Sequence, residues 1–226
     1  MPFLGSVEGS LGYGRQQQQQ QVAPGTDIKV AGNGTANLST TGLTALAGVA
    51  GQDDTGVTFP VPIDFFFFGT NYGNGNNTGI YWNTNNVIGF GTPVTTITWA
   101  ANTGIGVLIG NTDRRTNTFH YSSTKSTASG YDYVNFVLFA QNIYNDSVPN
   151  AIQWQIRLFR SSTIQYIEVR ASTAPATGGT WNITNGTTFQ NTYGSFTNVS
   201  AGSSFVLQSD GNGNNWQLFN NFRIPI

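Results

Sequence analysis

Short apolar segments separated by polar turns follow one another from Val57 to the end of the chain. Each segment is rich in Val, Ile, Thr, Phe, Tyr or Trp, and Gly, Asn, Pro or Asp stands at its ends. This pattern is typical of β-strands, and short strands at this spacing predict an all-β fold, an antiparallel sandwich or barrel, of which we expect the β-sandwich. The predicted strands are residues 57–68, 79–83, 86–90, 94–99, 105–110, 117–124, 131–142, 151–160, 163–171, 187–190, 203–208 and 216–224.

Residues 151–160 and 163–171 predict a β-hairpin with a two-residue turn at Ser161 and Ser162. The pairs that this turn predicts are Trp154 with Val169, Ile156 with Ile167, Arg157 with Tyr166, and Phe159 with Ile164. The side chains expected to face the core are Trp154, Ile156 and Leu158. Alternation along a strand places the next residues on the other face. The polar side chains expected to be solvated are Arg157, Arg160, Glu168 and Arg170.

Four consecutive phenylalanines, Phe65–Phe68, make both faces of a predicted strand apolar. Such a segment would aggregate if it were exposed, so we expect it to be covered on both sides. Pro60, Pro62 and Asp64 before the run, and Gly69 after it, should limit pairing at a sheet edge.

The first 25 residues lack a periodic apolar pattern and form a segment rich in Gly and Gln. We therefore divide the chain into an arm, residues 1–25, and a β-sandwich domain, residues 26–226, which opens with at most one short turn of helix before position 57. The arm is either a disordered tail or a segment that orders against a neighbouring subunit. In the second case its anchors are Phe3, Leu4, Val7, Leu11 and Tyr13.

Charge is sparse along this chain. It has 9 Lys and Arg residues against 10 Asp and Glu residues, a net charge of −1, and no cysteine. This balance disfavours nucleic-acid and membrane-surface partners, since both depend on a cationic surface. The chain has no long apolar run, and its N-terminus does not read as a signal peptide. We expect a surface of uncharged polar groups.

The candidate chemistry is thin, and we expect no enzyme activity, no cofactor and no metal site. Glu8 and Glu168 are the only glutamates, and neither stands in a setting that would raise its pKa. His120 lies in a predicted strand, where an imidazole is usually hydrogen-bonded rather than catalytic. The segment from Asp210 resembles the start of a calcium loop, but Asn221 stands where a bidentate Glu is needed, so we interpret it as a turn.

Two alternatives remain open. The first is a carbohydrate-binding module that uses loops 71–78, 111–116 and 210–216, although core packing should claim most of the tryptophans. Its candidate ligand residues are Tyr72, Arg114, Arg115, Asp210 and Trp216. The second is a glycan hydrolase, which requires two carboxylates in one cleft. The aspartates that would have to converge are two of Asp53, Asp54, Asp64, Asp113 and Asp132.

Two resemblances add to this interpretation. Residues 59–91, FPVPIDFFFFGTNYGNGNNTGIYWNTNNVIGFG, and residues 153–169, QWQIRLFRSSTIQYIEV, resemble nidogen-type extracellular β domains. That resemblance implies a sandwich used in adhesion or assembly. Residues 5–16, GSVEGSLGYGRQ, and residues 209–216, SDGNGNNW, are similar to segments of structural proteins from large double-stranded DNA viruses of algae and protists.

These observations predict a non-enzymatic structural protein of a virion, a minor capsid, vertex or fibre component that binds other virion proteins or further copies of itself. The alternative is a carbohydrate-binding adhesin or host-attachment module, with a glycan as partner. A Thr-, Asn- and Gly-rich surface with few charges favours assembly, because burying it strips water from few ions.

Overall fold

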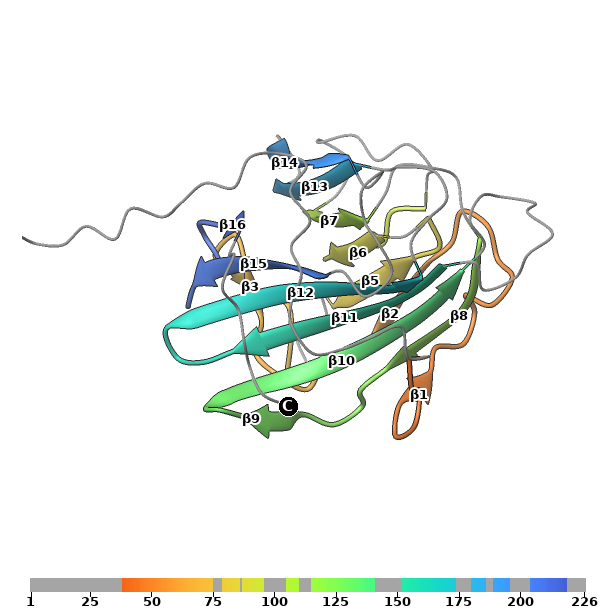
Figure 1. The fold of residues 1–226 in the computed structure, drawn as a ribbon, viewed down its shortest axis with the longest axis horizontal. Helices are drawn as coiled ribbons and strands as arrows, with labels where there is room; N and C mark the ends of the chain where they lie inside the picture. The colour runs from red at the N-terminus through yellow and green to blue at the C-terminus, as the bar shows by residue number, and fades with distance from the viewer. Residues whose placement is uncertain are drawn as a thin grey trace, which may run out of the picture.

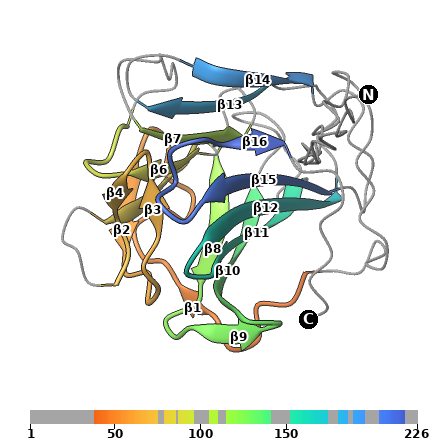
Figure 2. The same ribbon diagram turned by 90° about the vertical axis from the view of Figure 1, so that its left-hand side faces the viewer.

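A computed structural model describes residues 38–74, 79–85, 87–95, 105–109, 115–140, 152–173, 180–185, 189–195 and 204–218. The described residues form β-strands and turns and contain no helix. The strands pair antiparallel in two large sheets that face each other (Figures 1 and 2). The predicted all-β, sandwich-like fold is therefore confirmed, whereas the arm at residues 1–25 lies outside the described residues.

The larger sheet has eight strands, in the order β1-β8-β10-β11-β12-β15-β16, with β9 paired to β10. Long β10, β11 and β12 form its centre (Figure 1). The strands are β1 (Thr44–Ala45), β8 (Thr116–Tyr121), β9 (Ser126–Ala128), β10 (Tyr131–Ala140), β11 (Ile152–Arg160), β12 (Ile164–Thr173), β15 (Ser204–Asp210) and β16 (Gln217–Leu218).

The smaller sheet has six strands, in the order β14-β13-β7-β6-β5-β2. A separate two-stranded hairpin, β3-β4, completes the described strands. These strands are β2 (Gly56–Phe59), β3 (Phe66–Phe67), β4 (Thr70–Asn71), β5 (Ile80–Asn83), β6 (Val87–Phe90), β7 (Ile105–Ile109), β13 (Thr180–Asn185) and β14 (Phe189–Ser195).

An aromatic core joins the two sheets. Phe59 of β2 lies with its ring centroid 5.2 Å from that of Phe119 on β8 and 5.3 Å from that of Phe136 on β10. Trp82 of β5 stacks on Phe119 at 4.7 Å. Aromatic pairs at these separations add stabilisation to their area burial. Each of these four rings is at most 4% exposed, so the two sheets are closely packed where β2 and β5 meet β8 and β10.

The phenylalanine run does not continue one long strand from residue 57. Strand β2 ends at Phe59, and Pro60 and Pro62 interrupt the ladder because proline has no N–H to donate. Phe65 and Phe67 are fully buried, and Phe67 stacks on Phe90 at 4.1 Å. Phe66 and Phe68 are half-buried. The run is thus covered completely on one face and partly on the other.

The β11-β12 hairpin exists, but the predicted register is wrong by two residues. The observed pairs are Ile156 with Val169, Arg157 with Glu168, Leu158 with Ile167, and Phe159 with Tyr166. The turn lies one residue later than predicted, because the Ser161 hydroxyl accepts hydrogen bonds from the N–H groups of Thr163 and Ile164. A shift of two residues keeps each side chain on its face. Trp154, Ile156 and Leu158 therefore do face the core, as predicted.

Most other predicted strands are present with ends shifted by a few residues. Residues 94 and 95 are not in a strand, and 96–99 lie outside the described residues. No helical turn occurs in residues 38–56, where the short β1 lies instead. The strands that the sequence pattern did not predict are β1, β4, β9 and β13. The first three have two or three residues, too few to show an alternation.

Candidate functional site

The aromatic residues chosen as ligand contacts are part of the core. Tyr72 is 7% exposed and packs on Phe90, and Trp216 is 3% exposed and stacks on Phe65. Buried in the core, neither Tyr72 nor Trp216 offers a ring face to a ligand, contrary to the expectation that they are ligand residues. Trp82 and Trp154 are equally buried, as expected for core residues.

Asp210 closes a turn. Its exposed carboxylate accepts hydrogen bonds from the backbone N–H groups of Asn212, at 3.0 Å, and Asn214, at 3.1 Å. This is the local pattern by which Asp stabilises turns, so the interpretation as a turn is confirmed. Arg115 is half-buried and directly precedes β8. Arg114 and the arm residues Phe3, Leu4, Val7, Leu11 and Tyr13 lie outside the described residues.

Three charged side chains form a buried network on the outer face of the eight-stranded sheet. Glu168 is 1% exposed and forms ion pairs with Arg157 and with Arg170. Burial lowers the pKa of Arg170, the charge of Arg157 lowers it further, and Glu168 opposes both. The prediction that Arg157 and Glu168 are solvated is wrong. Cross-strand pairing places opposite charges side by side, which is the condition for burying them.

Apolar and aromatic side chains surround this network on the same face. Phe159 and Val206 are fully buried, Tyr166 is 6% exposed, and Tyr131 and Tyr133 pack against them. Burial raises the pKa of Tyr166, and its hydrogen bond with Tyr131 raises it further. The outer face of this sheet therefore has a second apolar cluster, in contrast to the polar face that an exposed antiparallel sheet usually presents.

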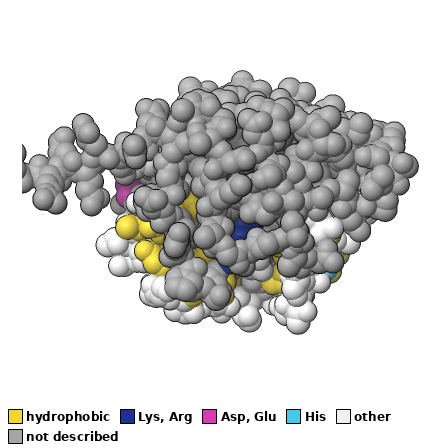
Figure 3. All heavy atoms as spheres, in the orientation of Figure 1, with side chains coloured by type: hydrophobic (Ala, Val, Ile, Leu, Met, Phe, Trp, Pro, Cys, Tyr) yellow, Lys and Arg dark blue, Asp and Glu magenta, His cyan; other side chains and the backbone are white. Residues whose placement is uncertain are grey.

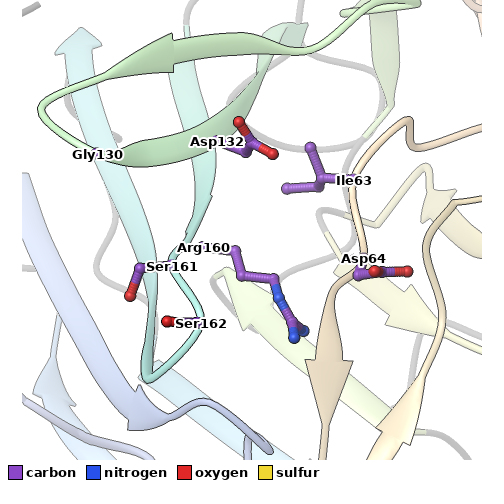
Figure 4. Close-up of a pocket in the computed structure, with 7 residues that line it drawn as sticks. All are labelled: Ile63, Asp64, Gly130, Asp132, Arg160, Ser161 and Ser162. Atoms are coloured by element: carbon purple, nitrogen blue, oxygen red, sulfur yellow. The ribbon is translucent and has the colours of Figure 1, made fainter.

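A polar hollow of about 250 Å³ lies at one end of the sandwich (Figure 4). Its lining comes from three segments: Ile63 and Asp64 before β3, Gly130 and Asp132 at the start of β10, and Arg160, Ser161 and Ser162 at the end of β11. The register of β10 and β11 explains why the hollow lies at this end of the sandwich. Val134 and Leu158 form the last apolar row of the inner face, and the next residues in phase, Asp132 and Arg160, are polar.

A tight turn brings Asp132 to the rim. Ser129 and Gly130 both have positive φ, at 50° and 81°, as the two-residue turn between β9 and β10 requires. The hairpin places Lys125 and Thr127 beside the Asp132 carboxylate, which accepts hydrogen bonds from both, at 2.7 and 2.9 Å. The hydrogen bond with Lys125 is the largest influence, and the pKa of Asp132 is lowered. Asp132 is therefore a charged acceptor and not an acid.

Arg160 reaches into the same hollow from β11. Its guanidinium lies 4.4 Å from the centroid of the Phe66 ring, a cation–π contact that fixes its position. Its Nη1 is buried and has no hydrogen-bond partner among the described residues. Arg160 pairs across the ladder with Asp132, yet the ion pairs of the described residues do not join these two side chains.

Asp64 completes the charged lining. Its Oδ1 accepts a hydrogen bond of 2.8 Å from the Asn71 side chain, and Figure 4 shows its carboxylate directed away from Arg160. Two of the aspartates named for the hydrolase alternative, Asp64 and Asp132, thus line one hollow. Hydrolysis of a glycoside also needs a carboxylic acid with a raised pKa, and the Asp132 pKa moves in the opposite direction.

His120 lies in β8, as predicted, and is half-buried. Burial lowers its pKa, and its buried Nδ1 has no hydrogen-bond partner among the described residues. Within the described ranges, no three His, Asp or Glu side chains are grouped closely enough to hold a metal ion. The same part of the chain has no helix long and apolar enough to span a membrane.

Comparison with protein families, curated proteins and solved structures found no match to this chain. The site must therefore be interpreted from its own geometry.

Proposed function

We propose that this protein is a non-enzymatic structural component of a virion, a minor capsid, vertex or fibre protein in which the sandwich is a rigid body and the N-terminal arm reaches across a neighbouring subunit. The partners would be other virion proteins or further copies of this chain. The observation that carries the proposal is the half-buried aromatic rim on the outer face of the eight-stranded sheet, formed by Tyr131 and Tyr133.

That rim has aromatic area of the kind found at protein–protein interfaces. Tyr131 and Tyr133 supply the accessible part of it, whereas Phe159 is fully buried and the charge of Arg157 is already paired with Glu168 within the sheet. Aromatic residues and arginine are enriched at interface cores. Covering the two tyrosines strips water from few charges, which keeps the desolvation cost low.

The sparse charge of the described surface supports the same role. On the side of the molecule drawn in Figure 3, most described side chains are uncharged, and Lys, Arg, Asp and Glu occupy small areas. The carboxylates also have structural tasks. Five of the described carboxylates accept hydrogen bonds that hold turns or strands. They are Asp54 from Asn85, Asp64 from Asn71, Asp132 from Lys125, Glu168 from Arg157, and Asp210 from the backbone of its own turn.

The first described strand lies at a sheet edge, a position from which an N-terminal arm could extend to a neighbouring subunit. Strand β1 is the edge strand of the eight-stranded sheet, and 37 residues precede Leu38. An extended chain spans up to about 3.3 Å per residue, so a segment of this length can reach well beyond its own sheet. The proposal assigns the anchoring contacts to Phe3, Leu4, Val7, Leu11 and Tyr13.

Truncation tests the role of the arm. Deleting residues 2–25 should leave a folded sandwich that no longer enters particles, as measured by mass spectrometry of purified particles. A variant with the five anchors changed to serine should fail in the same way. The matched control changes the six glutamines at 16–21 to serine and should be incorporated normally. Normal incorporation of the truncated chain would refute the role of the arm.

A further inference from the structure

We propose that the hollow between Asp132 and Arg160 binds a sugar unit that carries a carboxylate. The inference goes beyond the assembly role, since a single unassembled chain can carry such a site. It also places ligand binding away from Tyr72 and Trp216, which are core residues.

The first step is the state of Arg160. Its guanidinium is held over Phe66, and its Nη1 is buried without an acceptor among the described residues. Arg160 lines the hollow and takes part in no ion pair among the described residues, so its charge remains for a ligand. The planar guanidinium fork matches the two oxygens of a carboxylate better than any neutral group.

The second step is the separation of opposite charges. Asp132 and Arg160 are direct cross-strand partners on the inner face. Each is nevertheless held elsewhere: Asp132 by Lys125 and Thr127, and Arg160 by the Phe66 ring. The space between them is the hollow (Figure 4). A ligand that fills it meets a cation on one wall and a charged acceptor on the other.

The third step is the chemistry that satisfies both walls. A carboxylate pairs with Arg160, and hydroxyl groups on the same molecule donate to Asp132. Ser162 adds an exposed hydroxyl on the β11-β12 turn, whereas the Ser161 hydroxyl is already engaged with the turn backbone. An acidic sugar has this combination of one carboxylate and several hydroxyl donors.

The size of the hollow limits the ligand to one unit. Its volume of about 250 Å³ lies below the roughly 300–1,000 Å³ of pockets that hold drug-sized molecules. The Asp132 side chain is 37% exposed, so the hollow opens to solvent at its rim. A terminal monosaccharide of a longer glycan therefore fits, with the rest of the glycan outside.

The test uses the full chain and four probes: glucuronate, N-acetylneuraminate, glucose and acetate. Binding is followed by ligand-observed NMR and by calorimetry at millimolar ligand. We expect at least one of the two acidic sugars to bind, and glucose and acetate to bind at least about tenfold more weakly, since glucose lacks the carboxylate for Arg160 and acetate lacks the hydroxyl donors for Asp132. No binding of either acidic sugar overturns the proposal, as does equal binding of glucose or of acetate.

Variants then locate the site. Arg160→Gln should weaken binding about tenfold or more, and Ser162→Ala, on an exposed turn, should weaken it less. Arg115→Gln is the matched control, because Arg115 is a half-buried arginine that does not line the hollow. If Arg160→Gln fails to fold, Arg160→Lys, which keeps the charge and loses the fork, should show the weakened binding instead. Unchanged affinity in a folded Arg160 variant refutes the site, and particle incorporation is not part of this readout.

Discussion

Glu168→Gln should destabilise the sandwich by about 3–5 kcal/mol, the usual cost of leaving a buried charge without its partner. The substitution keeps the shape of the side chain and removes only its negative charge. Glu168 is 1% exposed, and the side chains of Arg157 and Arg170 are 10% and 14% exposed. Two largely buried guanidinium groups would then face each other with no counter-charge, and water cannot replace the lost carboxylate.

A surface ion pair supplies the matched control. Lys125 and Asp132 are 2.7 Å apart, but their side chains are 53% and 37% exposed. Exposed pairs contribute at most about 1 kcal/mol because water and salt screen them. Asp132→Asn should therefore change stability by no more than that amount.

Urea unfolding followed by tryptophan fluorescence measures both variants. Trp82, Trp154 and Trp216 are at most 3% exposed, so their emission reports the loss of the core. A loss of 3–5 kcal/mol corresponds to a fall in Tm of about 6–20 °C for a domain of this size. A Glu168→Gln cost no larger than that of Asp132→Asn would refute the reasoning.

A paired replacement separates burial of charge from loss of packing. Changing Arg157 to Met and Glu168 to Leu together removes both charges of the closest pair and keeps most of the volume, and it leaves Arg170, 14% exposed, with its hydrogen bond to the Gln155 side chain. Such replacements are often neutral or stabilising, so the double variant should be clearly more stable than Glu168→Gln. A double variant as unstable as the single one would show that the ion pair itself holds the strands together.

Three further perturbations test other parts of the structure. Thr116→Val should cost about 1–3 kcal/mol in urea unfolding, because the buried Trp82 Nε1 loses its acceptor at 3.0 Å. Gly89→Ala should lower the Tm and alter the near-ultraviolet circular dichroism, because an added Cβ would lie 1.9 Å from the Tyr81 ring; an unchanged Tm would contradict that contact. Burial lowers the pKa of His120, so the native state disfavours its protonation, and stability should fall as pH drops from about 6.5 through the lowered pKa. His120→Gln should flatten this part of the profile of unfolding free energy against pH, and an identical slope would refute the assignment.

The alternation of apolar and polar residues predicts which segments form strands better than it predicts the register in which the strands pair. The β11-β12 register was wrong by two residues because the turn begins after Ser161, whose hydroxyl caps it. Since side chains alternate with a period of two, Trp154 and Ile156 remained on the core face. The position of the turn depends on one local hydrogen bond. The face to which a side chain points depends on the alternation along the whole strand, so many residues of the sequence predict it together.

The burial of Glu168 had no such local signal. Around Glu168, apolar residues alternate with polar or aromatic ones, as in a sheet with one buried face. This alternation predicts that Glu168 faces solvent. The cluster around Phe159 and Tyr166 depends on four strands, β10, β11, β12 and β15, brought together by the register. Contacts between distant segments decide exposure here, and a single strand does not contain them.

The same alternation of apolar and polar residues predicts part of the hollow. Asp132 is in phase with Val134 and Phe136, and Arg160 is in phase with Ile156 and Leu158, all of which face the core. A charged residue in phase with a core face must either lie at its end or be paired inside it, because an unpaired buried charge is too costly. Both positions stand at strand ends, so the pattern indicates a polar end to the sandwich. It does not indicate that the two charges remain apart, since that depends on the approach of Phe66 and Lys125 from other segments. The separation that makes the hollow a binding site is thus a tertiary feature, and Arg160→Gln tests it directly.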